Sequence, residues 1–286
     1  MAINAETLIG YQRAEFAKSS KKRVWLFFLQ LATAVPAAAS VLVTDDFWVY
    51  VLAIAGFVLL VLWWRSFVGY QRTRTAAQAA RRAALLIGGL GGQLTPDATL
   101  TFRRLMTVTE ADAARHEKAD YFATSLPPGP AKLGEMLEES AFYSAHLQAL
   151  SASAMLGVLV VFAILFALMA FAALPFTDKA TTLTILRIFL AILVFAMSSD
   201  VLGAYLTHRN AARDIESVRT RLQLARAGNF PLTDVLLLMG EYNLAVEGAP
   251  EGVPYTYSFS ENRLNRLWAE YMGNLRQIEQ QSRGRK

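Results

Sequence analysis

The sequence has no cysteine among its 286 residues and only three histidines. The absence of cysteine excludes disulfides, cysteine-ligated zinc clusters and catalysis by a thiol. The histidines, His116, His146 and His208, stand far apart and lack the ligand spacing of a metal site. No serine lies in the pattern of a nucleophile elbow. We therefore expect no metal, no cofactor and no enzyme activity.

Charged side chains are also scarce at 18 %, while hydrophobic residues reach 54 %, a balance that is unusual for a soluble domain of this size. The hydrophobic residues concentrate in four runs, residues 24–43, 47–64, 154–174 and 183–205. Each run is close to the roughly 20 residues that are needed to cross a bilayer. The sequence therefore predicts an integral membrane protein with four transmembrane helices, grouped as two hairpins.

The two hairpin turns are short and carry little positive charge. Residues 44–46 and 175–182 are too few to form a domain, and Lys179 is their single basic residue. Basic residues instead cluster before the first run, after the second and after the fourth. Because positive side chains near a span are retained in the cytoplasm, both termini and the central segment are predicted to be cytoplasmic.

The first apolar run also has features of a secretory signal, namely a basic lead and three alanines at 37–39. The hydrophilic lead of residues 1–23 is long for a signal peptide. We therefore favour a retained span with a kink at Pro36.

The regions outside the four runs are predicted to be mainly helical, so the fold class is an all-α membrane protein with helical stalks and a mainly helical cytoplasmic domain. The expected organisation is a cytoplasmic N-terminal helix (1–23), a first transmembrane hairpin (24–64), a stalk and sensor insert (65–153), a second hairpin (154–205), and a stalk with C-terminal sensor helices (206–286).

Helix breakers and hydrophobic periodicity predict where the soluble helices end. The second run continues as a stalk to the glycine-rich segment 88–92. No lysine followed by serine or threonine comes after these glycines, so a turn is favoured over a phosphate cradle. Further helices are predicted from 130 into the third run, from the fourth run to 228, and over 111–122, 232–246 and 260–282. The alternating pattern of residues 99–109 predicts one short strand.

Polar side chains inside the apolar runs are the candidates for a pore or gate. Arg187 and Asp200 lie about 20 Å apart along the fourth predicted helix, so they cannot pair within it. A charge at bilayer depth costs about 2.5–3.5 kcal/mol and needs water, a partner or an interface. Ser198, Ser199 and Gln30 complete the set. Snorkelling to the membrane surface and helix packing are the competing interpretations.

Basic and aromatic residues of the last predicted helix are candidates for a nucleotide or oligonucleotide site, because cations bind phosphates and aromatic faces stack on bases. They are Arg263, Arg266, Trp268, Tyr271 and Arg276, with Arg103 and Arg104 as a second basic pair for the same ligand. Contact with anionic lipid and simple solvation are the competing interpretations.

Four short motifs carry a resemblance to a known family. They are PPGPAKL at 127–133, EESAF at 138–142, YNLA at 242–245 and LNRLW at 264–268. In these motifs the chain resembles the SMODS-associated four-transmembrane effectors, which are bacterial antiphage proteins. The resemblance implies a pore-forming effector in the bacterial inner membrane. It also implies a nucleotidyltransferase-like partner whose nucleotide signal opens or closes the pore.

The number of spans bears on the function. Four helices of one protomer seldom enclose a conducting path, so a pore needs several copies around an axis, and we expect a homo-oligomer such as a tetramer. The leading hypothesis is a ligand-gated pore in the lipid bilayer that depolarises the inner membrane. The alternative is a non-conducting membrane scaffold that binds a cytoplasmic protein partner. A small transporter is less favoured because the hairpins show no internal repeat.

Overall fold

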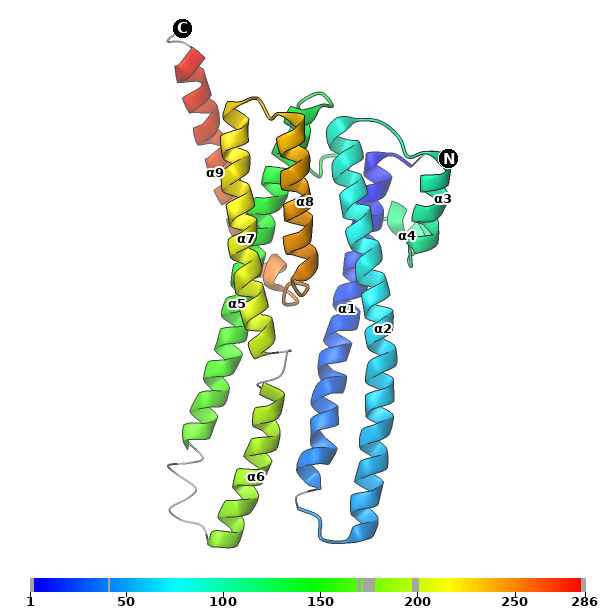
Figure 1. The fold of residues 1–286 in the computed structure, drawn as a ribbon, viewed down its shortest axis with the longest axis vertical. Helices are drawn as coiled ribbons and strands as arrows, with labels where there is room; N and C mark the ends of the chain where they lie inside the picture. The colour runs from blue at the N-terminus through cyan, green and yellow to red at the C-terminus, as the bar shows by residue number, and fades with distance from the viewer. Residues whose placement is uncertain (1–2, 41, 169–170, 172–177, 197–200, 284–286) are drawn as a thin grey trace. The chain divides into compact units, whose positions relative to one another are not determined.

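The structure, a computed structural model, describes residues 3–40, 42–168, 171, 178–196 and 201–283. This part of the chain forms nine helices and contains no strand (Figure 1). The predicted all-α class is confirmed for these residues. The helices are α1 (Ala5–Ala39), α2 (Asp46–Leu90), α3 (Pro96–Leu105), α4 (Glu110–Ala114), α5 (Pro130–Leu168), α6 (Lys179–Ala196), α7 (Leu202–Ala227), α8 (Leu232–Gly248) and α9 (Thr256–Arg283).

The chain divides into two compact units. Unit 1 comprises Met1–Tyr121 and Ala152–Thr207, and unit 2 comprises Phe122–Ser151 and His208–Lys286. Two helices are shared between them. The first part of α5 belongs to unit 2 and its second part to unit 1, whereas α7 starts in unit 1 and continues in unit 2.

In unit 1, α1 and α2 form a long antiparallel pair (Figure 1). From Tyr70 onward α2 buries small side chains, which let a neighbouring helix approach closely. They include Ala76, Ala77, Ala80 and Ala84. The short helix α4 also approaches α1 closely, since a Cβ added to Gly10 of α1 would lie 2.5 Å from the carbonyl oxygen of Ala113 of α4.

A buried carboxylate attaches α1 to the loop that follows α3. Glu15 is fully buried, and its carboxylate accepts hydrogen bonds from the Thr107 amide at 2.5 Å, the Thr107 hydroxyl at 2.6 Å and the Val108 amide at 2.9 Å. Lys18 donates to the Thr107 carbonyl oxygen at 2.5 Å. These bonds compensate for the cost of burying a charged group.

In unit 2, the first part of α5 packs with α7, α8 and α9. An aromatic core contains Phe142 of α5 with Leu264 and Trp268 of α9, and Tyr143 and Tyr271 lie partly buried against it. The rings of Phe142 and Trp268 lie 5.2 Å apart, centroid to centroid. Apolar and aromatic contacts of this kind explain why α9, with one apolar face, docks on α5.

The strand predicted over residues 99–109 is wrong, because residues 99–105 belong to α3. The Thr95 hydroxyl caps the helix by accepting a bond from the Ala98 amide at 3.2 Å. Pro96 stands in the first turn, where its missing N–H costs no helical hydrogen bond. Phe102 is the buried residue of this helix, so the alternation of apolar residues does not mark a strand face.

The helix predicted over residues 111–122 is also wrong in its length, since α4 covers only Glu110–Ala114. Thr109 caps its start by accepting from the Asp112 amide at 3.1 Å. Past its end, Arg13 of α1 donates to the carbonyl oxygen of His116 at 2.8 Å. A contact from a distant helix thus satisfies a carbonyl group that a longer helix would have used.

The other helix predictions agree with the structure to within a few residues. Helix α2 continues to Leu90, α5 runs without interruption from Pro130, and α8 and α9 cover the last two predicted ranges. Pro36 lies inside α1. The predicted continuity between the fourth apolar run and α7 depends on residues 197–200, which lie outside the described part of the chain.

Candidate functional site

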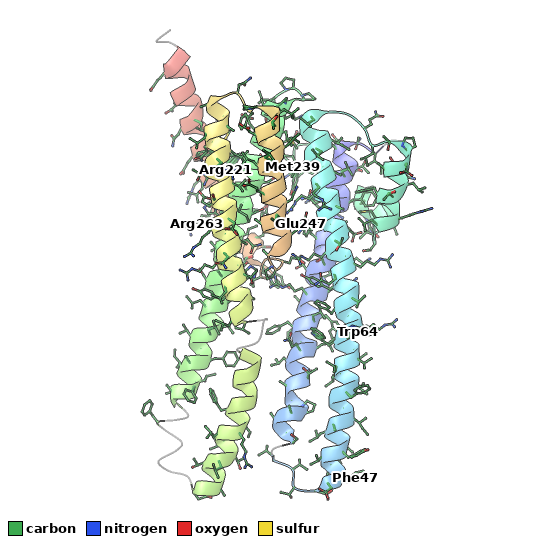
Figure 2. All side chains as sticks on the ribbon, viewed as in Figure 1. Phe47, Trp64, Arg221, Met239, Glu247 and Arg263 are labelled. Atoms are coloured by element: carbon green, nitrogen blue, oxygen red, sulfur yellow. The ribbon has the colours of Figure 1, made fainter. Side chains whose placement is uncertain are left out.

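Two of the helices, α2 and α5, are long and apolar enough to cross a membrane. In α2 the apolar stretch runs from Phe47 to Trp64, both labelled in Figure 2, and none of its 18-residue apolar window is buried inside the protein. Ile54 and Phe57, near its middle, are 55 % and 66 % exposed. Soluble proteins seldom expose so much contiguous apolar surface, and this observation indicates membrane association.

The environment of α2 changes along its length without a break in the helix. Residues 47–64 extend over about 27 Å, which is close to the roughly 30 Å thickness of a bilayer core. From Tyr70 onward the helix buries one face, which includes Thr73, Ala77 and Leu85. One helix therefore has an apolar part in which no residue of the 18-residue window is buried and a second part packed inside unit 1.

Helix α5 shows the same change in the opposite chain direction. Its first part buries Leu133, Leu137 and Ala141 in unit 2. Further along the helix Val161 and Ile164 are exposed, and 11 % of its apolar window is buried. The change again occurs within one continuous helix of 39 residues.

Helix α1 contains residues 24–39 of the first apolar run, and α6 contains residues 183–196 of the fourth. The run in α1 exposes large side chains such as Trp25, Phe28 and Val35. In unit 1, Phe189 of α6 stacks on Phe166 of α5, with ring centroids 4.2 Å apart and ring planes at 29°. Helices α5 and α6 therefore contact each other inside unit 1.

A cluster of charged and polar side chains joins three helices of unit 2. Arg226 of α7 pairs with two carboxylates of α5, Glu135 at 3.0 Å and Glu138 at 2.7 Å. Tyr271 of α9 donates to the second oxygen of Glu138, and Gln223 of α7 donates to the Tyr271 hydroxyl at 3.0 Å. The Glu138 side chain is fully buried, so its charge depends on these partners. These five residues are the Glu138 cluster.

A second arginine of α7 lies against the aromatic core. The Arg219 guanidinium is 5.1 Å from the ring centroids of both Phe142 and Tyr271 and pairs with Glu216 at 2.8 Å. Burial, followed by the hydrogen bond to Glu138, raises the pKa of Tyr271 to about 12. The phenol therefore remains a neutral donor at physiological pH. Together these contacts hold α5, α7 and α9 in one packing arrangement.

The residues of α9 that were predicted to bind a nucleotide lie on two different faces. Trp268 is 6 % exposed, and with Tyr271 it belongs to the aromatic core. Arg263, labelled in Figure 2, and Arg266 are exposed, and Arg266 lies 3.9 Å from Glu270. The structure therefore does not bring the stacking rings and these cations together on one surface. The side chain of Arg276 lies outside the described part.

The second basic pair belongs to α3. Arg103 and Arg104 are exposed residues of unit 1, and Arg103 pairs with Glu110 at 3.2 Å. One of the two charges is thus balanced locally. That this pair and the residues of α9 bind the same ligand remains a prediction, because α3 and α9 belong to different units.

Two of the pore candidates lie in the described part. Arg187 is an exposed residue of α6, and Gln30 is a half-buried residue of α1. Ser198, Ser199 and Asp200 lie outside the described residues. A pore lined by these side chains therefore remains a prediction.

No site role was predicted from the sequence for Glu135, Glu138, Gln223 or Arg226. A weak signal was present. The spacing of Glu135, Glu138 and Phe142 places two acidic residues on the same helix face as a core aromatic residue. The partner of Glu138 lies 88 positions further along the chain, so no local pattern identifies it.

Within the described ranges, no group of three or more acidic or histidine side chains is placed to hold a metal ion. In comparisons with protein-family models, curated proteins and solved structures, nothing matches this chain.

Proposed function

We propose that the chain is a membrane effector in which several copies assemble into an ion-conducting pore, controlled by unit 2. The observation that carries this proposal is the continuity of α5, which contributes to the Glu138 cluster in its first part and ends in an exposed apolar stretch. The helix is about 58 Å long. A change in the packing of unit 2 would move the apolar end of the same rigid element.

The proposal places four spans in the bilayer, with the apolar runs of α1 and α6 joining those of α2 and α5. Exposed aromatic residues at both ends of the α2 stretch support a span, because such side chains gather at membrane interfaces. They are Phe47, Trp48 and Trp64. The basic residues that flank the spans favour an orientation with both termini in the cytoplasm.

We further propose that the controlling signal is a nucleotide or short oligonucleotide from a nucleotidyltransferase-like partner, and that the open pore depolarises the inner membrane of a phage-infected bacterium. The resemblance of the four motifs supports this assignment. One of them, 264–268, contains the core residues Leu264 and Trp268 together with the exposed Arg266. An anionic ligand on this exposed face would act next to the aromatic core.

Ion flux through liposomes that contain the purified full chain tests the proposal. Cyclic dinucleotides, cyclic trinucleotides and short oligonucleotides are added in turn, and at least one is expected to change the flux. Three glycines inserted after Ser153 interrupt α5 and should abolish the response to the ligand. The matched control inserts three glycines after Gly92, in the exposed loop that follows α2, and should retain the response.

Two outcomes contradict the proposal. A wild-type protein that conducts under none of these conditions is not a pore of this kind. A response that survives the interruption of α5 shows that this helix does not couple unit 2 to the membrane part.

The scaffold hypothesis has one observation in its favour. Leu237 and Leu244 of α8 are 62 % and 77 % exposed, and their seven-residue spacing places them on one helix face. A protein partner would bury this face, as would another copy of the chain. A scaffold produces no flux in liposomes, so the same measurement separates the two hypotheses.

A further inference from the structure

A groove in unit 1 lies between α1 and α2, where the exposed apolar part of each helix meets its basic part. It is lined by Lys22, Trp25, Leu62, Arg65, Ser66 and Gly69 and has a volume of about 430 Å³. Lys22 precedes the apolar run of α1, and Arg65 follows that of α2. If these runs cross a bilayer, the groove lies at the level of the lipid headgroups.

Among the residues that line the groove, Lys22 is held in position by two hydrogen bonds. Lys22 Nζ donates to the carbonyl oxygen of Gly69 at 2.7 Å and to the Thr73 hydroxyl at 2.7 Å. An ammonium group has three donors, and these two bonds leave one for a ligand. Burial, followed by the charge of Lys18, lowers the pKa of Lys22. An anion in the groove would raise this pKa again, because it would stabilise the charged form of Lys22.

The other side chains that line the groove are of two chemical kinds, polar and apolar. Arg65 and Ser66 add a second cation and a hydroxyl donor on the α2 side, whereas Trp25 and Leu62 are apolar and 57 % and 47 % exposed. A phosphate group suits the first set, because cationic donors form strong hydrogen bonds to phosphate oxygens. A hydrocarbon chain suits the second set.

We propose that this groove binds an anionic phospholipid, with its phosphate at Lys22 and Arg65 and an acyl chain along Trp25 and Leu62. Free phosphate shares the first half of this chemistry but not the second, and the exposed apolar wall favours the lipid. The inference rests on the membrane insertion in the proposed function, but not on conduction. By bridging α1 and α2, the lipid would stabilise the packing of the stalk where it leaves the membrane.

The test measures lipid retained by the full chain in a non-ionic detergent, which removes the general attraction of a charged bilayer surface. Dioleoyl phosphatidylglycerol is the anionic probe and dioleoyl phosphatidylcholine the neutral one, and native mass spectrometry counts the bound molecules. We expect one phosphatidylglycerol to be retained per chain in preference to phosphatidylcholine. Arg65→Gln and Lys22→Gln should each weaken its binding about tenfold.

Lys21→Gln is the matched control, because Lys21 is an exposed basic neighbour on α1 that does not line the groove. It should change the affinity less than about twofold. Arg65→Gln leaves the bonds from Lys22 to α2 in place, so it tests the site even if Lys22→Gln does not fold.

Three results would overturn the inference: equal retention of the two lipids, equal weakening by Lys21→Gln, or displacement of phosphatidylglycerol by inorganic phosphate at the same concentration. Alkaline extraction of cell membranes reports insertion separately. A protein that inserts and conducts but retains no phosphatidylglycerol contradicts this inference alone, whereas a protein released by alkali contradicts the proposed function.

Discussion

At the residue scale, Gly134 of α5 shows how closely two elements of unit 2 approach. A Cβ at this position would lie 2.3 Å from Cδ1 of Phe230. Phe230 has a left-handed backbone, with φ of 53°, and its ring centroid lies 5.3 Å from the Arg226 guanidinium carbon. These constraints limit how far the ring can move away.

Replacing Gly134 by alanine should therefore lower the free energy of unfolding by about 1–3 kcal/mol through overpacking. The matched control is Gly240→Ala in α8, where an added Cβ meets nothing within 4 Å. That change should raise stability by about 0.5–1 kcal/mol through helix propensity. Denaturant unfolding in detergent, followed by circular dichroism, measures both. Similar effects of the two substitutions would contradict the predicted overpacking.

Burial distinguishes Arg226 from Arg221, two arginines of α7 that each pair with glutamate. Arg226→Met leaves the fully buried Glu138 without its cation and should cost about 3–5 kcal/mol of stability. Arg221→Met removes an exposed pair with Glu241, both side chains being about half exposed, and should cost less than about 1 kcal/mol. The same unfolding measurement compares them. Adding Glu138→Gln to Arg226→Met should restore part of the loss, and failure to do so would argue against an unpaired charge as the cause.

At the scale of elements, α2 presents one exposed apolar part and one part packed on protein. Ile54→Arg places a charge near the middle of the apolar stretch, which should cost about 2.5–3.5 kcal/mol of membrane insertion. Thr75→Arg is the control, because Thr75 is exposed on the same helix beyond the stretch. The fraction of protein that resists alkaline extraction from membranes should fall for the first variant only. An unchanged fraction for Ile54→Arg would mean that the stretch does not face lipid.

Helices α3 and α4 show where element prediction from sequence fails. The cap of α3 is visible in the local sequence, since Thr95 and Pro96 are adjacent. The alternation of apolar residues that follows them nevertheless favoured a strand. The end of α4 depends on a distant residue, because Arg13, which is 103 positions away in the sequence, donates a hydrogen bond to the carbonyl oxygen of His116. Neighbouring residues in the sequence therefore indicate the cap of α3, but they do not indicate the contact that ends α4.

At the scale of the whole molecule, the proposed pore requires more than one copy of a 31.6 kDa chain. Light scattering in mild detergent should therefore give a protein mass that is a multiple of this value, with a tetramer as the expected state. Leu237→Ser with Leu244→Ser should lower this mass if the exposed face of α8 joins the copies. A monodisperse monomer that still conducts in liposomes would rule out the oligomeric pore.

The sequence by itself determined the helical class, the apolar runs, the ends of α2 near Leu90 and of α7 near Ala227, and the absence of thiol chemistry. These features depend on composition and on periodicity within a few turns of helix. Periodicity also predicted the helix over residues 260–282, which corresponds to α9. Only the tertiary structure decided that Phe142 covers one face of α9 and that Arg226 neutralises Glu138. Such contacts join residues far apart in the chain, and local periodicity contains no information about which distant residues meet.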